Sequence, residues 1–275
     1  MPIFAAASNA EEQIFNEVVH LLVRQRDASV SGALIELKAQ LEAIYQRKMK
    51  DVVACQMGLG LANLGLGDHA EAFRLIANAQ KIAPGVDYVV GNAIVAFVNM
   101  GYFEDALKLA NTAVVRFEGD QLVLRAATLA LESTLHFEEA SQSIDNLLKF
   151  APDANMQASL VARQALLAQL AARGKHDGFD GDSLMARAQC AVECLKRSGK
   201  QIFSIDLRGV HVNSVALELS IDASPQECAE LNYVVAEALF DNFEDATAVD
   251  LVTFSVRSFV GASPLSTFAD SRVIA

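Results

Sequence analysis

Residues 53–86 read VACQMGLGLANLGLGDHAEAFRLIANAQKIAPGV, and the next 34 residues, 87–120, read DYVVGNAIVAFVNMGYFEDALKLANTAVVRFEGD. The two segments carry small residues at the same offsets: Gly67 and Gly101, Ala72 and Ala106, Ala79 and Ala113. The spacing continues beyond them, since Ala140 follows Ala106 after one period and Pro152 follows Pro84 after two. Several residue types in one 34-residue register indicate an internal repeat.

The recurring residues fit a pair of antiparallel helices. A glycine at the end of a first helix adopts the left-handed conformation at the lowest cost, which predicts turns at Gly67 and Gly101. An alanine in the second helix lets neighbouring helices approach closely, which predicts the closest contacts at Ala72, Ala106 and Ala140. Negative charge near the start of a second helix, as at Asp68, offsets the helix dipole.

This pattern resembles the tetratricopeptide repeat (TPR) family, whose unit is a 34-residue helix–turn–helix. In this numbering the repeats run over 53–86, 87–120 and 121–154, and in the third Leu135 replaces the turn glycine. The resemblance implies a mainly α fold, a TPR-like right-handed solenoid of helical hairpins. It covers about two-fifths of the chain.

The flanks extend this organisation. Apolar residues at helical spacing predict helices over 10–26 and 34–45, so residues 1–52 are interpreted as a capping hairpin. Residues 156–172 and 184–196 predict two more helices joined by a loop from Gly174 to Asp182, which would complete an array over 53–198 with a degenerate last hairpin.

Beyond Gly199 the period changes to two. Alternation over 201–207, 215–221 and 250–259 predicts three strands, and Ser224-Pro225 opens a helix through about residue 240. Residues 199–275 are therefore predicted to form a small α+β unit of β-β-α-β order. Such a unit has little core of its own, so we expect it to pack on the last helices or to form a homodimer through a strand edge.

Composition restricts the function. The chain is 52% hydrophobic and carries a formal net charge of −12, which argues for a folded acidic protein and against nucleic acid or anionic membranes as partners. Its first residues lack the features of a secretion signal, no stretch reaches the length of a membrane span, and its four cysteines are scattered. A cytoplasmic location is the expectation.

The family resemblance implies a partner-binding groove lined by the first helix of each repeat. Carried over to this chain, its lining is Met57, Leu61, Leu64, Tyr88, Asn92, Val95, Val98, Leu122, Arg125 and Leu129, with Glu132 beside it. Of the basic clamp that chaperone-binding members use, Asn92 alone matches. The groove is therefore predicted to take an apolar helix or extended peptide, unless residues 1–26 or 199–275 fill it.

No residue set predicts catalysis, a metal site or a cofactor. Cys190 and Cys194 share one face of a helix without further zinc ligands nearby, so we interpret them as core thiols. Asp177, Asp180 and Asp182 do not have the spacing of a calcium loop and are interpreted as a solvated turn. His211 with Asp206 and Arg208 forms the one polar cluster of the tail, interpreted as exposed turn residues.

Three functions remain open. The first is a protein-interaction adaptor that is not an enzyme. The second is a chaperone for a secreted or unstable cargo, because the acidic charge and apolar groove resemble the three-repeat chaperones of type III secretion. The third is an enzyme or regulator that acts through residues 199–275.

Overall fold

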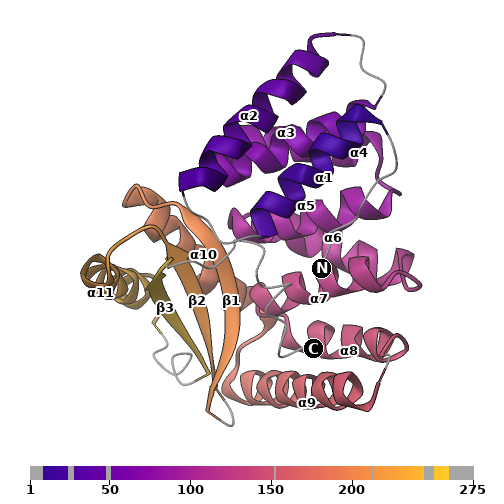
Figure 1. Ribbon diagram of the computed structural model, residues 1–275. Coiled ribbons are helices and arrows are strands. Elements are labelled where there is room, and N and C mark those ends of the chain that lie inside the picture. The colour runs from indigo at the N-terminus through magenta and orange to yellow at the C-terminus, as the bar shows by residue number, and fades with distance from the viewer. Residues whose placement is uncertain are drawn as a thin grey trace.

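The computed structural model describes residues 9–23, 28–47, 51–151, 153–211, 214–244 and 251–259. It is mainly helical, with a small three-stranded sheet towards the C-terminus (Figure 1). The helices in chain order are α1 (Ala10–Val23), α2 (Ala28–Tyr45), α3 (Val52–Leu66), α4 (His69–Ile82), α5 (Asp87–Asn99), α6 (Phe103–Arg116), α7 (Gln121–Ser133), α8 (Phe137–Leu148), α9 (Ala154–Asp177), α10 (Gly181–Arg197) and α11 (Pro225–Asn242). The strands are β1 (Ile202–His211), β2 (Ser214–Ile221) and β3 (Val252–Ser258).

The turns between α3 and α4, α5 and α6, and α7 and α8 share one hydrogen-bond pattern. Just after each first helix, the N–H of Asp68, Tyr102 or His136 donates to the carbonyl five residues earlier, that of Asn63, Phe97 or Leu131 respectively. The residue immediately before each donor has a positive φ; these residues are Gly67, Gly101 and Leu135. These are Schellman turns spaced 34 residues apart, and the third forms although a leucine occupies it.

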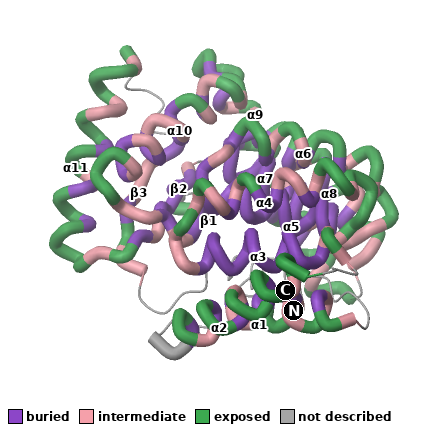
Figure 2. Tube along the Cα trace, turned by 90° about the horizontal axis from the view of Figure 1, so that it is seen from above, coloured by how far each residue is buried: buried purple, intermediate pink, exposed green. Residues whose placement is uncertain are grey.

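Burial separates first helices from second helices. Every residue from Ala54 to Gly65 in α3, and from Val89 to Asn99 in α5, is buried. The second helices α4, α6 and α8 bury one face only, on which Ala72, Ala106 and Ala140 are completely buried. Because a helix that is buried all round must be packed on every side, α3 and α5 form the interior of the molecule (Figure 2).

The N-terminal helices pack on each other and both pack on α3. The second of them begins earlier than predicted, at Ala28 instead of residue 34. The reason is that the buried stripe of Leu34, Leu37 and Leu41 continues one turn back to Val30.

The predicted loop from Gly174 to Asp182 is wrong in extent. Helix α9 continues through Gly174 to Asp177, and α10 begins at Gly181. Gly178 ends α9 in the left-handed conformation, and Asp180 caps α10 with a capping box to Ser183. Helix α9 packs on α8, whereas α10 packs on α11 and β1. The boundaries after residues 52 and 198 stay predictions.

The β-β-α-β order of the tail is confirmed. Strand β2 lies in the centre, antiparallel to β1 and parallel to β3. Leu217 and Leu219 of β2 lie on the apolar face of the sheet, while Glu218 on the other face is bridged by the exposed Arg208 and Arg257. Along β3, the Asn232 side chain of α11 bonds both the N–H and the carbonyl of Val256. Part of this strand edge is therefore already paired.

Candidate functional site

The ten side chains predicted to line a groove all lie on α3, α5 and α7, but most are inside the protein. Tyr88, Leu122, Arg125 and Leu129 are partly exposed. The other six are buried: Met57, Leu61, Leu64, Asn92, Val95 and Val98. In this conformation a partner could reach only the four partly exposed side chains.

Helix α1 covers one part of the predicted groove, on α3 and α5. The ring of Phe15 lies 5.4 Å from the ring of Tyr88, and its backbone packs over Gly58 in α3. Burial is the main cause that raises the pKa of Tyr88 above its ordinary value. The side-chain amide of Asn92, the one match to a carboxylate clamp, donates to the carbonyl of Tyr88 at 2.7 Å. Asn92 is thus bonded within its own helix.

Strand β1 covers another part of the predicted groove, where it packs against α5 and α7. A buried ion pair fixes this junction: Arg163 of α9 donates to both carboxylate oxygens of Glu132 at 2.9 and 2.8 Å. The same guanidinium reaches the carbonyl of Leu207 in β1 at 3.4 Å. Burial alone lowers the pKa of Arg163, but the charge and hydrogen bonds of Glu132 raise it overall. Glu132, expected beside an open groove, therefore has a structural partner.

Arg125, Leu122 and Leu129 of α7 are three of the four partly exposed side chains of the predicted set. Nη2 of Arg125 lies 3.6 Å from the sulfur of Met156, and burial lowers the pKa of this guanidinium. Leu122 and Leu129 lie on the same helix, seven residues or about two turns apart, and both stay partly exposed. This part of α7 is what remains available of the predicted groove.

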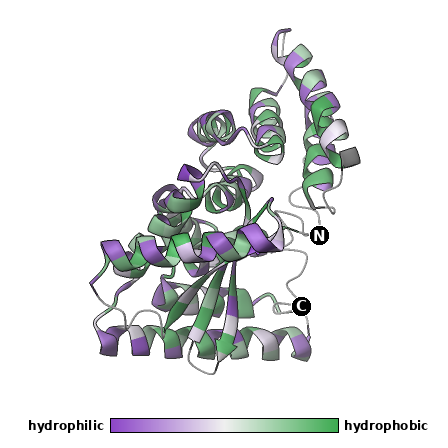
Figure 3. Ribbon diagram, turned by 90° about the vertical axis from the view of Figure 1, so that its left-hand side faces the viewer, coloured by the Kyte–Doolittle hydropathy of each residue, from purple (hydrophilic) through white to green (hydrophobic). Residues whose placement is uncertain are grey.

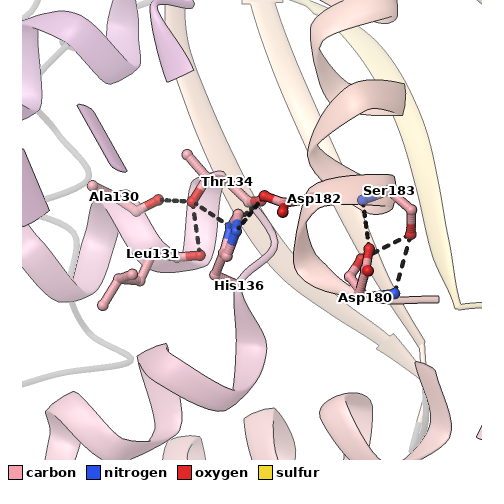
Figure 4. A network of polar contacts seen from close by, with 7 residues as sticks. All are labelled: Ala130, Leu131, Thr134, His136, Asp180, Asp182 and Ser183. Atoms are coloured by element: carbon pink, nitrogen blue, oxygen red, sulfur yellow. Dashed lines mark hydrogen bonds and ion pairs between the residues drawn. The ribbon is translucent and has the colours of Figure 1, made fainter. Parts of the chain in front are cut away.

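The C-terminal part of the chain lies across the three Schellman turns, which the sequence did not predict. The third turn meets the start of α10, where His136 packs on Gly181 and Nε2 lies 3.4 Å from Asp182 (Figure 4). The second turn meets the other half of α10, because Val192 packs over Gly101. We call residues 181–201 the turn strap.

The turn strap also contacts the first turn, and it makes one further contact with the second. Gln201 packs over Gly67 and reaches His69, with 3.4 Å between Nε2 atoms. The ammonium group of Lys196 lies 4.9 Å from the centre of the Tyr102 ring. The strap therefore contacts the turns in the reverse of their chain order.

The other candidate clusters have structural partners. The thiols of Cys190 and Cys194 point at carbonyls of α11, those of Ala238 and Val234, each at 3.7 Å. Asp180 caps α10, and Asp177 lies in the last turn of α9. Asp206 accepts a hydrogen bond from Ser204. The side chain of His211 lies outside the described residues. Within the described part of the chain, no three His, Cys, Asp or Glu side chains are grouped as metal ligands.

Helix α11 carries a feature that sequence reasoning missed. Tyr233 and Phe240 are 79% and 80% exposed, although the helix packs through its opposite side. In Figure 3 this helix lies in the foreground, in front of the sheet. A spacing of seven residues could have indicated that the two rings share one face. Because aromatic residues are enriched at protein interfaces, this face is a candidate binding surface.

No family model matches this chain, and neither a curated protein nor a solved structure is significantly similar to it. No helix in the described ranges is both long and apolar enough to cross a bilayer.

Proposed function

We propose that this protein is a cytoplasmic interaction scaffold, a TPR-like right-handed solenoid that binds other proteins and is not an enzyme. Its C-terminal α+β unit presents the principal binding surface. The observation that carries the proposal is the pair of exposed rings, Tyr233 and Phe240, on a helix whose other face is firmly packed.

The regular turns support the solenoid part of the proposal. The three Schellman turns recur every 34 residues, and successive helices from α3 to α9 pack on one another in chain order. Leu135 is instructive because a non-glycine residue in the left-handed region costs about 1–2 kcal/mol. The packing around it is sufficient to hold the same turn without the favourable residue.

The exposed rings support the binding part of the proposal. An aromatic side chain buries about 150–250 Å² in an interface, and each Å² of apolar area contributes roughly 25 cal/mol. Two fully buried rings therefore contribute several kcal/mol to association before its entropic cost. Aromatic residues of this kind dominate the binding energy of many interfaces.

The groove on α7 is the second candidate surface, because Leu122, Arg125 and Leu129 keep part of their surface exposed. It would take a short apolar segment. A cargo chaperone would use this same surface, and a regulator would use the C-terminal unit. The homodimer through a strand edge is a separate proposal, tested by sedimentation of the full chain at micromolar concentration.

Site-specific photo-crosslinking tests the proposal. A benzophenone amino acid at position 233, at 129 on the groove, or at 115 as a control is activated in native lysate. Val115 is 78% exposed on α6, so it matches Tyr233 in accessibility. We expect discrete products with other proteins from position 233 and none from position 115. Products from position 129 alone would favour the groove, and equal products from 233 and 115 would contradict the proposal.

A further inference from the structure

The exposed face of α11 has the geometry of one half of a helix pair. Ala229, Tyr233, Ala236 and Phe240 are separated by four, three and four residues, and all are exposed. At about 100° per residue, Tyr233 and Phe240 point in directions that differ by only about 20° around the helix axis. The two alanines lie beside them on one flank, so large side chains alternate with small ones. A three–four spacing of this kind is how one helix receives the side chains of another.

The opposite flank of the same face is acidic. Glu230, Glu237 and Asp241 are exposed and lie about 40–80° from Tyr233 on the other side from the alanines. The helix from Pro225 to Asn242 contains no lysine or arginine. A partner on this face therefore meets a row of negative charge along one edge, with no basic residue of the helix itself to offset it.

Helix α11 is held so that this face stays outward. Cys228, Leu231 and Val235 are buried on the far side of the helix. Asn232 bonds the backbone of Val256 in β3 through two hydrogen bonds of 3.1 and 2.7 Å. Rotation that turned Tyr233 inward would break these bonds and expose three apolar side chains. The surface is thus preorganised for a partner.

We propose that this face of α11, the helix-docking face, binds an amphipathic basic helix of another protein. The inference rests on the proposed scaffold function and specifies its partner. Aliphatic side chains of the partner pack over Ala236 between the two rings and over Ala229 one turn before Tyr233. Its lysines or arginines lie along Glu230 and Glu237. A second copy of α11 is a poor partner, because it offers no lysine or arginine to Glu230 and Glu237, and an antiparallel pair places carboxylates against carboxylates.

The test uses a synthetic probe of about three heptads with leucine at two positions per heptad and lysine elsewhere. A scrambled peptide of the same composition has no apolar face, and a third peptide replaces lysine by glutamate. Binding of each labelled peptide to the full chain is measured by fluorescence anisotropy at two salt concentrations. We expect the amphipathic lysine peptide to bind at least tenfold more tightly than either control.

Matched variants locate the binding. Tyr233→Ala and Phe240→Ala should each weaken the amphipathic lysine peptide about tenfold or more. Glu230→Gln with Glu237→Gln should weaken it several-fold and reduce its salt dependence, because the partner then lacks the facing carboxylates. The control Glu138→Gln with Glu139→Gln removes two exposed carboxylates from α8 and should leave binding unchanged. All these side chains are exposed, so circular dichroism should show unaltered folding.

Several results would overturn the inference. Equal binding of scrambled and amphipathic lysine peptides, or equal losses in the α8 control, would show general attraction to an acidic protein. A photo-crosslink from position 233 to a second copy, or within the chain to residues 260–275, would assign another occupant. A crosslink from 233 to another protein with no binding of the lysine probe would leave the scaffold function standing and reject the basic helix.

Discussion

Replacing Gly101 by alanine adds one atom, Cβ, which strains the second Schellman turn and also collides with the turn strap. Gly101 has a φ of 69°, where an alanine costs about 1–2 kcal/mol. Its added Cβ would also overlap Cγ1 of Val192. Val192 is completely buried and branched at Cβ, so it has little freedom to move and overpacking adds about 1–3 kcal/mol. We therefore expect Gly101→Ala to destabilise the fold by about 2–5 kcal/mol.

Gly67 provides the matched control. It occupies the same position of the first turn, with a φ of 90°, but its Cβ would meet the end of the Gln201 side chain. That amide belongs to a flexible chain and can move aside. Gly67→Ala should therefore cost about 1–2 kcal/mol, the backbone part alone.

Urea denaturation followed by circular dichroism measures both variants, with the midpoint and slope fitted separately. Val192→Ala makes room for the new methyl group. The double variant Gly101→Ala with Val192→Ala should therefore be about 1–3 kcal/mol more stable than the sum of the single effects. Gly67→Ala with Val192→Ala should be additive. Equal losses for the two glycines, or no coupling between 101 and 192, would refute the contact between the turn and the strap.

Three further predictions concern packing and charge. Arg163→Met should cost about 3–5 kcal/mol because it leaves Glu132 charged and buried, whereas adding Glu132→Leu should recover most of the loss in the same urea assay. Ala106→Leu should cost about 1–3 kcal/mol and lower the melting temperature by several degrees, unlike Asn111→Leu on the exposed side of the same helix. Hydrogen bonds from the Ser224 backbone and from Lys200 lower the pKa of Glu227 from 4.5 to about 2, so its contribution is full above pH 4.5 and disappears as pH falls towards 2. Glu227→Gln should therefore lower the melting temperature at pH 7, by a difference that shrinks across that range.

The helices and turns of residues 52–148 could be predicted because their signals are local. A glycine at 67 or 101 ends a helix within its own hairpin. An alanine at 72 or 106 indicates close packing against a helix that is near in sequence. The β-β-α-β order likewise follows from alternation within each strand. Gly174 misled the prediction because a glycine inside a long helix has the same local signal as a loop. Its place in α9 depends on Phe179, whose carbonyl would lie 3.3 Å from an added Cβ.

Whether the candidate groove is open or covered could not be predicted, because the segments that cover it are distant in the sequence. Phe15 reaches Tyr88 from 73 residues earlier in the chain, and the Arg163 guanidinium links Glu132 to Leu207. Neither contact has a periodic signal. The exposure of Tyr233 is similar, since the sequence predicts its helix but not which of its faces meets the rest of the protein.

The turn strap has a consequence for the order of events during synthesis. Gln201 reaches His69 across 132 residues of chain, so this contact forms only after most of the protein has left the ribosome. Hairpins that touch only their neighbours unfold piecewise from the ends. Once the turn strap has docked, the first, second and third turns are all joined to one segment of 21 residues, so loosening one contact weakens the attachment of all three. We therefore expect amide hydrogens in α4, α6 and α8 to exchange together in the finished protein and separately in the nascent chain.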